Sequence, residues 1–264
     1  MAIAKKHNTL NDFMDLKRQG QRITMLTAYD FTIAKILDQA GVDGILVGDS
    51  LGMVVQGRET TLKVSLDEMI YHAEMVGRAV QHSLIVVDLP FPTHLVGDHE
   101  AIAAAARILK ETECQTVKLE GGVQQAGTIA ALVAAGIPVM GHIGLQPQSV
   151  LTMGGYKVQR DEEQLLADAK AVEDAGAFAV VLECMEAAIA AKITEASSIP
   201  TIGIGAGEHC DGQVIVTNDL LGLTNSPPRF VKEYAQLQST IGDAVSQYCQ
   251  DVRSKTFPDS SNSY

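Results

Sequence analysis

Residues that can donate protons, bind cations or hold an anion stand at the ends of short apolar segments. They are Asp49 and Ser50 after GILVG, Asp88 in LIVVD, Lys118 and Glu120 in TVKLE, His142 after PVMG, and Glu183 after AVVL. Any one of them has a structural explanation, since a strand that ends beside solvent is commonly capped by a polar residue. Carboxylates that converge from several strands, however, repel one another unless a cation lies between them. Because oxygen ligands suit hard ions such as Mg²⁺, the set predicts a metal site.

Eight short runs rich in β-branched residues predict eight strands. They span about residues 22–29, 44–49, 84–89, 116–120, 138–142, 179–183, 200–204 and 213–217. Most of these runs are apolar throughout, which is typical of a parallel sheet covered on both faces. Amphipathic stretches separate most of them, so strands and helices alternate along the chain.

The predicted helices carry recognisable start and stop signals. They cover about residues 31–41, 65–80, 101–113, 124–136, 161–176 and 186–198. Ser65 and Glu68 form a capping box at one helix start. Gly41, Gly136 and Gly176 follow helical runs, where a left-handed residue ends a helix. A further amphipathic helix at about 9–19 is expected to close the bottom of a barrel.

The eight alternations favour a single (β/α)₈ barrel over a doubly wound sheet. No GxGxxG motif opens a helix after the first strand, which argues against a dinucleotide-binding fold. The linker before the eighth strand is too short for a full helix, so that unit should be irregular. We expect one domain over residues 1–264, with a tail that frays from about residue 251. Catalytic groups of such barrels lie at the C-terminal ends of the strands, which places the polar residues on one rim.

Two loops are longer than most strand-to-helix connections, and both follow strands that end in the polar set. Residues 50–64 follow the second strand, and residues 143–160 follow the fifth. Long loops in a compact domain are typically lids or binding loops. At the end of the first strand, Tyr29 and Asp30 either line the pocket or cap the following helix.

Composition excludes several classes of protein. The formal net charge of −12 argues against a nucleic-acid partner, because phosphate binding needs a basic surface. No apolar run approaches the ~20 residues that span a bilayer, and the first residues lack the apolar core of a secretory signal. The four cysteines lack the spacing of a zinc site or a disulfide framework, which favours reduced thiols in the cytoplasm.

Segments spread along the chain resemble the ketopantoate hydroxymethyltransferase family in order and spacing. They are TAYD (27–30), VGDSLGMVVQG (47–57), DLPF (88–91), VKLEGG (117–122), MGHIGLQPQ (140–148), LEC (182–184), GIGAG (203–207), CDGQV (210–214) and NDLLGL (218–223). The resemblance implies a Mg²⁺-dependent barrel of the phosphoenolpyruvate/pyruvate type. It also implies transfer of a hydroxymethyl group from 5,10-methylenetetrahydrofolate to 3-methyl-2-oxobutanoate through an enolate. The product, 2-dehydropantoate, is the first committed intermediate of pantothenate synthesis, and the family assembles as homo-decamers.

The resemblance further implies a role for each residue of the rim. Asp49, Asp88 and Glu120 match the Mg²⁺ site, with the two aspartates as the expected direct ligands and Glu120 close to or bridged to the ion. The positions that match oxo-acid contacts are Asp49, Ser50, Asp88, Lys118 and His142. Glu183 matches the acceptor of the proton that leaves C3 of the oxo acid.

Several alternatives stay open from the sequence. The family usually has valine and proline after LEC, whereas this chain has Met185 and Glu186, so Glu186 is a rival for the base. Lys118 could instead form a structural salt bridge, and His142 could be a core residue. A related metal-dependent C–C lyase or mutase would share the barrel, and a non-catalytic binding barrel would share only the fold.

Overall fold

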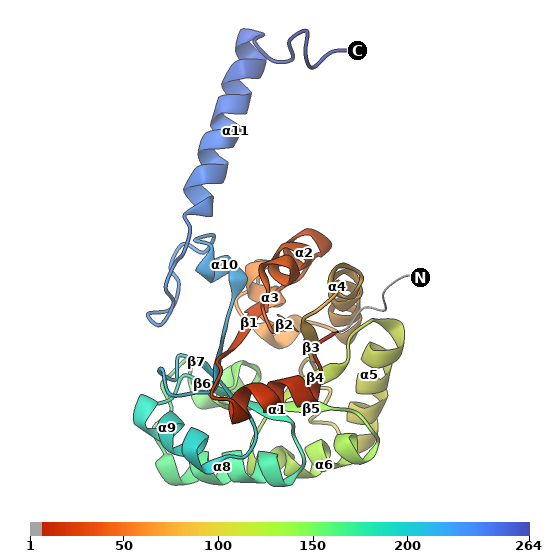
Figure 1. The fold of residues 1–264 in the computed structure, drawn as a ribbon, viewed down its shortest axis with the longest axis vertical. Coiled ribbons are helices and arrows are strands. Elements are labelled where there is room, and N and C mark those ends of the chain that lie inside the picture. The colour runs from red at the N-terminus through yellow and green to blue at the C-terminus, as the bar shows by residue number, and fades with distance from the viewer. Residues whose placement is uncertain (1–6) are drawn as a thin grey trace. The chain divides into compact units, whose positions relative to one another are not determined.

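The computed structural model describes residues 7–264, and its core is a closed barrel of eight parallel strands in sequence order (Figure 1). The strands are β1 (Ile23–Thr27), β2 (Gly44–Val47), β3 (Leu84–Asp88), β4 (Thr116–Glu120), β5 (Val139–Gly144), β6 (Ala179–Glu183), β7 (Thr201–Ile204) and β8 (Gly212–Ile215). β8 pairs with β1 and closes the barrel, with Met25 opposite Val214. The predicted (β/α)₈ fold is therefore confirmed, and each predicted strand is present within a few residues.

Helices cover the outside of the barrel, where Figure 1 shows them following the strands in turn. The longer ones are α2 (Phe31–Ala40), α4 (Leu66–Ala79), α5 (Asp98–Glu111), α6 (Ala126–Ala134), α8 (Glu162–Asp174) and α9 (Ala187–Ala196). The predicted capping box of Ser65 and Glu68 is formed at the start of α4. No helix separates β7 from β8 in the described chain, so the irregular eighth unit is confirmed.

The bottom of the barrel is closed by α1 (Leu10–Arg18), as the amphipathic pattern predicted. Its Phe13 is fully buried and packs edge-on against Phe178, with the ring centroids 6.2 Å apart. Gly44 leaves room for this ring, since an added Cβ there would lie 3.0 Å from Phe13. Truncating a buried phenylalanine typically costs ~3–5 kcal/mol, so this plug contributes substantially to stability.

The barrel interior changes character along its axis. The lower part is one apolar cluster, lined by Met25, Leu46, Val86, Met140, Val181, Ile202 and Val214. Side chains alternate between the two faces of a strand, so residues two positions apart share the interior. Two positions beyond Val86, Met140 and Val181, the interior residues are Asp88, His142 and Glu183. The strand pattern that fills the core thus also places the polar layer at the C-terminal end.

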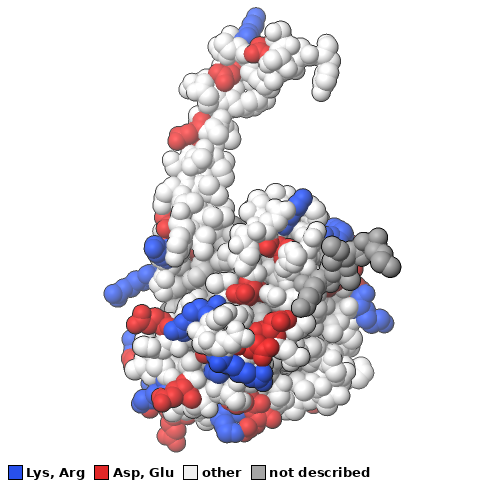
Figure 2. Space-filling view, in the orientation of Figure 1, with Lys and Arg blue, Asp and Glu red and all other residues white. Residues whose placement is uncertain are grey.

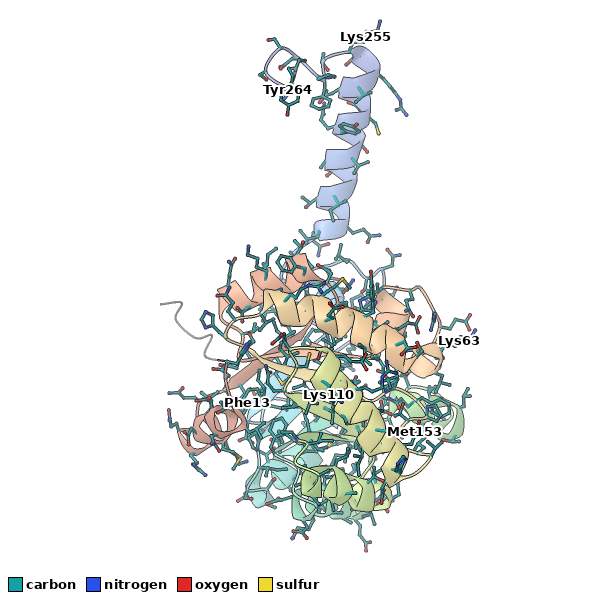
Figure 3. All side chains as sticks on the ribbon, turned by 90° about the vertical axis from the view of Figure 1, so that its right-hand side faces the viewer. Phe13, Lys63, Lys110, Met153, Lys255 and Tyr264 are labelled. Carbon is teal, nitrogen blue, oxygen red and sulfur yellow. The ribbon has the colours of Figure 1, made fainter. Side chains whose placement is uncertain are left out.

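Short helices interrupt the two long loops. The loop after β2 contains α3 (Leu51–Val54) and the 3₁₀ helix η1 (Thr61–Lys63). The loop after β5 contains η3 (Pro147–Ser149) and α7 (Val150–Met153), and the loop after β4 contains η2 (Val123–Gln125). In Figure 3, Met153 and Phe13 lie on opposite sides of the barrel unit, which separates this loop from the bottom plug.

Residues 216–264 form a second compact unit. It holds α10 (Thr217–Leu220) and α11 (Leu237–Ser254), and Tyr234 N donates a 2.8 Å hydrogen bond to Leu220 O within it. No residue of α11 is buried, and the helix continues past residue 251. The single domain and the frayed tail therefore stay predictions. No helix among the described residues is long and apolar enough to cross a membrane.

Candidate functional site

The C-terminal end of the barrel brings the predicted residues into one buried cluster. Asp49, Asp88, Lys118, Glu120 and His142 are each at most 5% exposed. Glu183 closes the cluster at the end of β6 and is partly exposed. Ser50 lies beside it at the start of α3, where its Oγ is 2.8 Å from the hydroxyl of Tyr29. Figure 2 shows acidic and basic side chains mixed on the visible face of the barrel unit, whereas the residues of this cluster are buried inside it.

A buried ion pair anchors the cluster. Lys118 Nζ lies 2.9 Å from Asp88 Oδ1, and both side chains are almost fully enclosed. Burial alone would lower the pKa of Lys118, but the carboxylates of Asp88, Glu120 and Asp49 outweigh burial and raise that pKa to about 12. The ammonium is therefore a permanent positive charge in the barrel mouth.

His142 lies between this ammonium and the carboxylate of Glu183. Its Nδ1 is 3.2 Å from Lys118 Nζ, and its Nε2 is 3.0 Å from Glu183 Oε2. Burial, followed by the charge of Lys118, lowers the pKa of His142, so the ring is neutral. Because an ammonium can only donate, Nδ1 must accept, and the ring proton belongs on Nε2. The tautomer that follows carries its proton on the nitrogen nearest to Glu183.

Excess negative charge remains around the lysine. Burial and the neighbouring Asp88 raise the pKa of Asp49 to about 7. Burial and Asp49 together raise the pKa of Glu120 well above its ordinary value. One lysine thus fails to compensate the buried carboxylates, which is the condition under which a cation binds.

Hydrogen bonds hold one oxygen of each carboxylate in the proposed metal site, and Lys118 pairs with the second oxygen of Asp88. Asp88 Oδ2 accepts from Asp49 N at 3.0 Å. Gln148 holds the other two: its Nε2 donates to Asp49 Oδ2 at 2.8 Å, and its backbone N–H donates to Glu120 Oε2 at 3.0 Å. The opposite oxygens of two of them, Asp49 Oδ1 and Glu120 Oε1, accept no hydrogen bond in the described part of the chain, whereas Asp88 Oδ1 faces the Lys118 ammonium at 2.9 Å.

This donor set fits a hard divalent cation. No three His, Cys, Asp or Glu side chains among the described residues already surround a single metal position. Mg²⁺ does not need such a cage, because it commonly keeps several waters and takes one or two carboxylates from the protein. Carboxylate oxygens of Asp49 and Glu120 that accept no hydrogen bond, together with uncompensated negative charge, supply what such an ion requires.

Comparison with known proteins identifies the family. Residues 7–260 match the model of the family described as ketopantoate hydroxymethyltransferase. A 3-methyl-2-oxobutanoate hydroxymethyltransferase of Rhodopirellula baltica is 54% identical over 98% of this chain and 97% of its own. One of Prosthecochloris aestuarii is 52% identical over 98% and 96%.

The chain belongs to the ketopantoate hydroxymethyltransferase family. It is therefore an enzyme of the hydroxymethyltransferase class, and the alternative of a non-catalytic barrel is set aside.

Solved structures share the barrel at much lower identity. Phosphonopyruvate hydrolase superposes with a TM-score of 0.63 at 12% identity, covering 98% of this chain and 93% of its own. 2,3-Dimethylmalate lyase, a member of the PEP mutase/isocitrate lyase superfamily, gives 0.60 at 16% identity, covering 92% and 87%. Such distant likeness shows the fold alone. It agrees with the predicted barrel fold, whereas the lyase or mutase activity has no support from identity.

The structure separates the two carboxylates that the sequence left as rivals in this hydroxymethyltransferase. Glu183 is the last residue of β6 and faces His142, whereas Glu186 precedes α9 and pairs with Arg160 at 2.9 Å on the exposed side. Cys184 between them has a left-handed backbone (φ 45°), a strained conformation that turns the chain away after Glu183. Burial raises the pKa of the Cys184 thiol to about 12, so it is not a thiolate.

Two residues of the site were missed by sequence reasoning. Gln148 lies in the long loop after β5 and ends the family segment MGHIGLQPQ. The sequence therefore indicated the segment, but it did not indicate that Gln148 contacts the carboxylates. His94, from the loop after β3, is buried, and its Nδ1 has no hydrogen-bond partner in the described structure. Burial lowers the pKa of His94 to about 4. No sequence pattern distinguished it from a loop histidine. At the first strand, Asp30 caps α2, whereas Tyr29 is buried against Ser50.

Removing the buried ammonium should destabilise the fold in a pH-dependent way. We expect Lys118→Met to lower the free energy of unfolding by ~3–5 kcal/mol at pH 8, because the carboxylates lose their counter-charge. A carboxyl group whose pKa is higher in the folded state than in the unfolded state is protonated at low pH and then costs the fold little. As the pH rises the group ionises, and its destabilising effect grows. Asp49 and Glu120 are such groups, and the loss should therefore shrink at pH 5.5. Urea unfolding at the two pH values measures both quantities.

Lys170→Met is the matched control, since Lys170 forms an exposed pair with Asp174 on α8. Its effect should be small at either pH, as for exposed ion pairs in general. An equal loss of stability for Lys118→Met at both pH values would refute the electrostatic explanation.

Proposed function

We propose that this enzyme transfers a hydroxymethyl group from 5,10-methylenetetrahydrofolate to 3-methyl-2-oxobutanoate, giving 2-dehydropantoate. The relatives that carry the name 3-methyl-2-oxobutanoate hydroxymethyltransferase support the acceptor, since they match at 54% and 52% identity over nearly the full chain. The observation that carries the chemistry is the row Lys118, His142 and Glu183, a fixed cation joined to a carboxylate through a neutral ring. The reaction would begin pantothenate synthesis. Four unpaired cysteines suit a reducing cytoplasm.

The acceptor is an anion with a carboxylate and an adjacent carbonyl oxygen. Lys118 is placed to attract it, while Ser50 can donate a hydrogen bond to one of its oxygens. Asp49 and Asp88 would hold Mg²⁺, with Glu120 nearby through its uncommitted oxygen. The ion would supply Lewis acidity to the two acceptor oxygens and so acidify the hydrogen on C3.

Glu183 is the residue we assign as base. Its carboxylate is only partly buried and lies at the mouth of the barrel, where it can receive the proton from C3. One of its carboxylate oxygens lies 3.0 Å from His142 Nε2. Lys118 stabilises the negative charge that develops on the acceptor oxygen as the proton leaves. The resulting enolate carbon then forms the bond to the methylene carbon of the donor. The two C–N bonds of that carbon break, the folate nitrogens take the electron pairs and two protons, and water supplies the hydroxyl oxygen of the product.

The metal assignment predicts a pH-dependent affinity for Mg²⁺. Asp49 must lose its proton to bind the ion, and its pKa is raised to about 7. The affinity should therefore be full above pH 7 and fall by up to about tenfold per pH unit below it. Calorimetric titration at pH 8, 7 and 6 measures this.

Activity should vanish in EDTA and return with Mg²⁺, and Asp88→Asn should weaken both metal binding and rate. Full activity in excess chelator would end the metal assignment.

The base assignment predicts a partial reaction that needs no donor. With Mg²⁺ and 3-methyl-2-oxobutanoate in D₂O, the enzyme should exchange the C3 hydrogen for deuterium. Glu183→Gln keeps the shape but loses the base, so exchange should fall by ~10²–10⁴-fold while the oxo acid still binds. Glu186→Gln is the control and should exchange normally, because Glu186 pairs with Arg160 outside the cluster. Normal exchange in the first variant and its loss in the second would show the wrong carboxylate has been named.

The chain is further proposed to assemble as a homo-oligomer of ten subunits, the number that the family resemblance implies. Support comes from α11, which exposes Ile241, Val245, Tyr248 and Val252 along one stripe at helical spacing. Such a stripe needs an apolar partner. Light scattering at micromolar concentration should give a mass near ten chains, and a monomer would contradict the assembly without affecting the catalytic assignment.

A further inference from the structure

We infer that a pocket beside the end of β6 binds the pterin end of the folate donor, an inference that rests on the proposed function. The pocket has a volume of about 380 Å³ and lies between the loops after β4 and β5 and the first turns of α8. Its polar lining consists of four glutamines and two aspartates: Gln124, Gln146, Gln159, Gln164, Asp161 and Asp168. None of these residues belongs to the cluster of the oxo-acid site.

The pocket adjoins the strand that carries Glu183. Gly144, which lines it, ends β5 opposite Glu183, and an added Cβ there would lie 2.2 Å from the Glu183 carbonyl oxygen. Gln159, which also lines the pocket, donates a 2.7 Å hydrogen bond from its backbone N–H to the carbonyl oxygen of Cys184, the residue after Glu183. A molecule seated here lies beside the backbone of the residue that would deprotonate the acceptor.

Asp168 gives the pocket its chemical preference. It is buried, and no lysine, arginine or histidine pairs with it in the described chain. Its Oδ1 accepts from Val123 N at 2.9 Å and from Gln164 Nε2 at 3.0 Å, while no described hydrogen bond ends on Oδ2. Buried carboxylates without a cation are rare, because their desolvation is uncompensated. A ligand that offers N–H groups to Oδ2 would compensate it.

The pterin of a reduced folate has the matching edge. Its 2-amino group and the adjacent ring N–H are parallel donors, the arrangement that a carboxylate accepts best. The glutamine amides both donate and accept, so they can pair with the ring carbonyl and with the other ring N–H groups. Phosphate or carboxylate ligands would instead be repelled by the two aspartates.

The rim of the pocket has the opposite charge, which suits the other end of the same molecule. Lys157 and Arg160 flank Gln159 on the loop after β5, and both are exposed. Lys157 forms no ion pair within 4.0 Å in the described structure, and Arg160 pairs with Glu186 at the surface. The glutamate carboxylates of folate, which lie at the far end from the pterin, would meet these cations.

Asp168 also has a structural role, since its Oδ1 holds the start of η2 and the side chain of Gln164. Asp168→Asn separates the two roles, because asparagine keeps an oxygen acceptor for Val123 N while the carboxylate charge is lost. Asp174→Asn, at the other end of α8, is the matched control and removes an exposed carboxylate.

The test combines ligand binding with the donor-free exchange. For Asp168→Asn, the Kd of tetrahydrofolate by calorimetry and the KM of methylenetetrahydrofolate should both rise by about tenfold or more. The KM of the oxo acid should stay unchanged. Deuterium exchange at C3, which reports a folded enzyme and an intact oxo-acid site, should stay within about twofold of the wild type. Gln146→Leu should act in the same direction if Asp168→Asn fails to fold.

Lys157→Ala tests the orientation. It should weaken tetrahydrofolate, which carries the glutamate, but not 6-methyltetrahydropterin, which lacks it. Unchanged tetrahydrofolate binding in both Asp168→Asn and Gln146→Leu would overturn the pocket assignment. If the wild type exchanges the C3 hydrogen but does not bind tetrahydrofolate, the assignment of a folate as donor is overturned. If the wild type does not exchange the C3 hydrogen, the proposed function is overturned instead.

Discussion

The contact between Lys118 and Asp88 is the constraint on which the C-terminal half of the barrel depends. Each buried ion costs several kcal/mol in lost hydration, and a pair repays this only when both partners keep good contacts. Here a single ammonium serves Asp88 at 2.9 Å and also lowers the energy of Asp49 and Glu120. The raised pKa values of the latter two show that its charge is insufficient for all three. The barrel mouth therefore holds a charge imbalance, and the stability that permits it comes from the apolar layers and the Phe13 plug below.

The neutral ring of His142 determines what that imbalance can do. An ammonium on one side fixes the acceptor nitrogen, and the proton is left on the other nitrogen, which lies 3.0 Å from Glu183 Oε2. The ring thus transmits the position of the lysine to the carboxylate without taking up charge itself, because burial and Lys118 both lower its pKa. The cation and the carboxylate to which we assign the developing oxygen charge and the departing proton are consequently held in one row across β4, β5 and β6.

The sequence predicted the strands and the residues at their ends because both depend on local patterns. Apolar runs mark the strands, and the polar residues at the ends of these runs mark the barrel mouth. The set found in this way is Asp49, Ser50, Asp88, Lys118, Glu120, His142 and Glu183. Contacts made by loops were not predictable in this way. Gln148 reaches Asp49 from a segment 99 residues away in the chain, and only the fold sets that contact. The choice between Glu183 and Glu186 likewise needed the register of β6 against β5, since both residues are acidic and three positions apart. Helix α11 was not predicted either, although its apolar residues recur at helical spacing.

Gln148 joins these two levels of structure. Its backbone N–H holds Glu120 and its side chain holds Asp49, while a second hydrogen bond from Nε2 to Leu89 O keeps the amide from rotating. A carboxylate has about four lone-pair sites, so one oxygen of each can be fixed by this residue while the other stays open to a ligand. The same loop continues through Gly154, which has a positive φ of 69°, to Tyr156, whose hydroxyl contacts Met53 of the other long loop. Movement of this loop would therefore displace a hydrogen-bond donor from two buried carboxylates at once. Since uncompensated buried carboxylates are costly, the charge at the barrel mouth itself favours the position of the loop seen here.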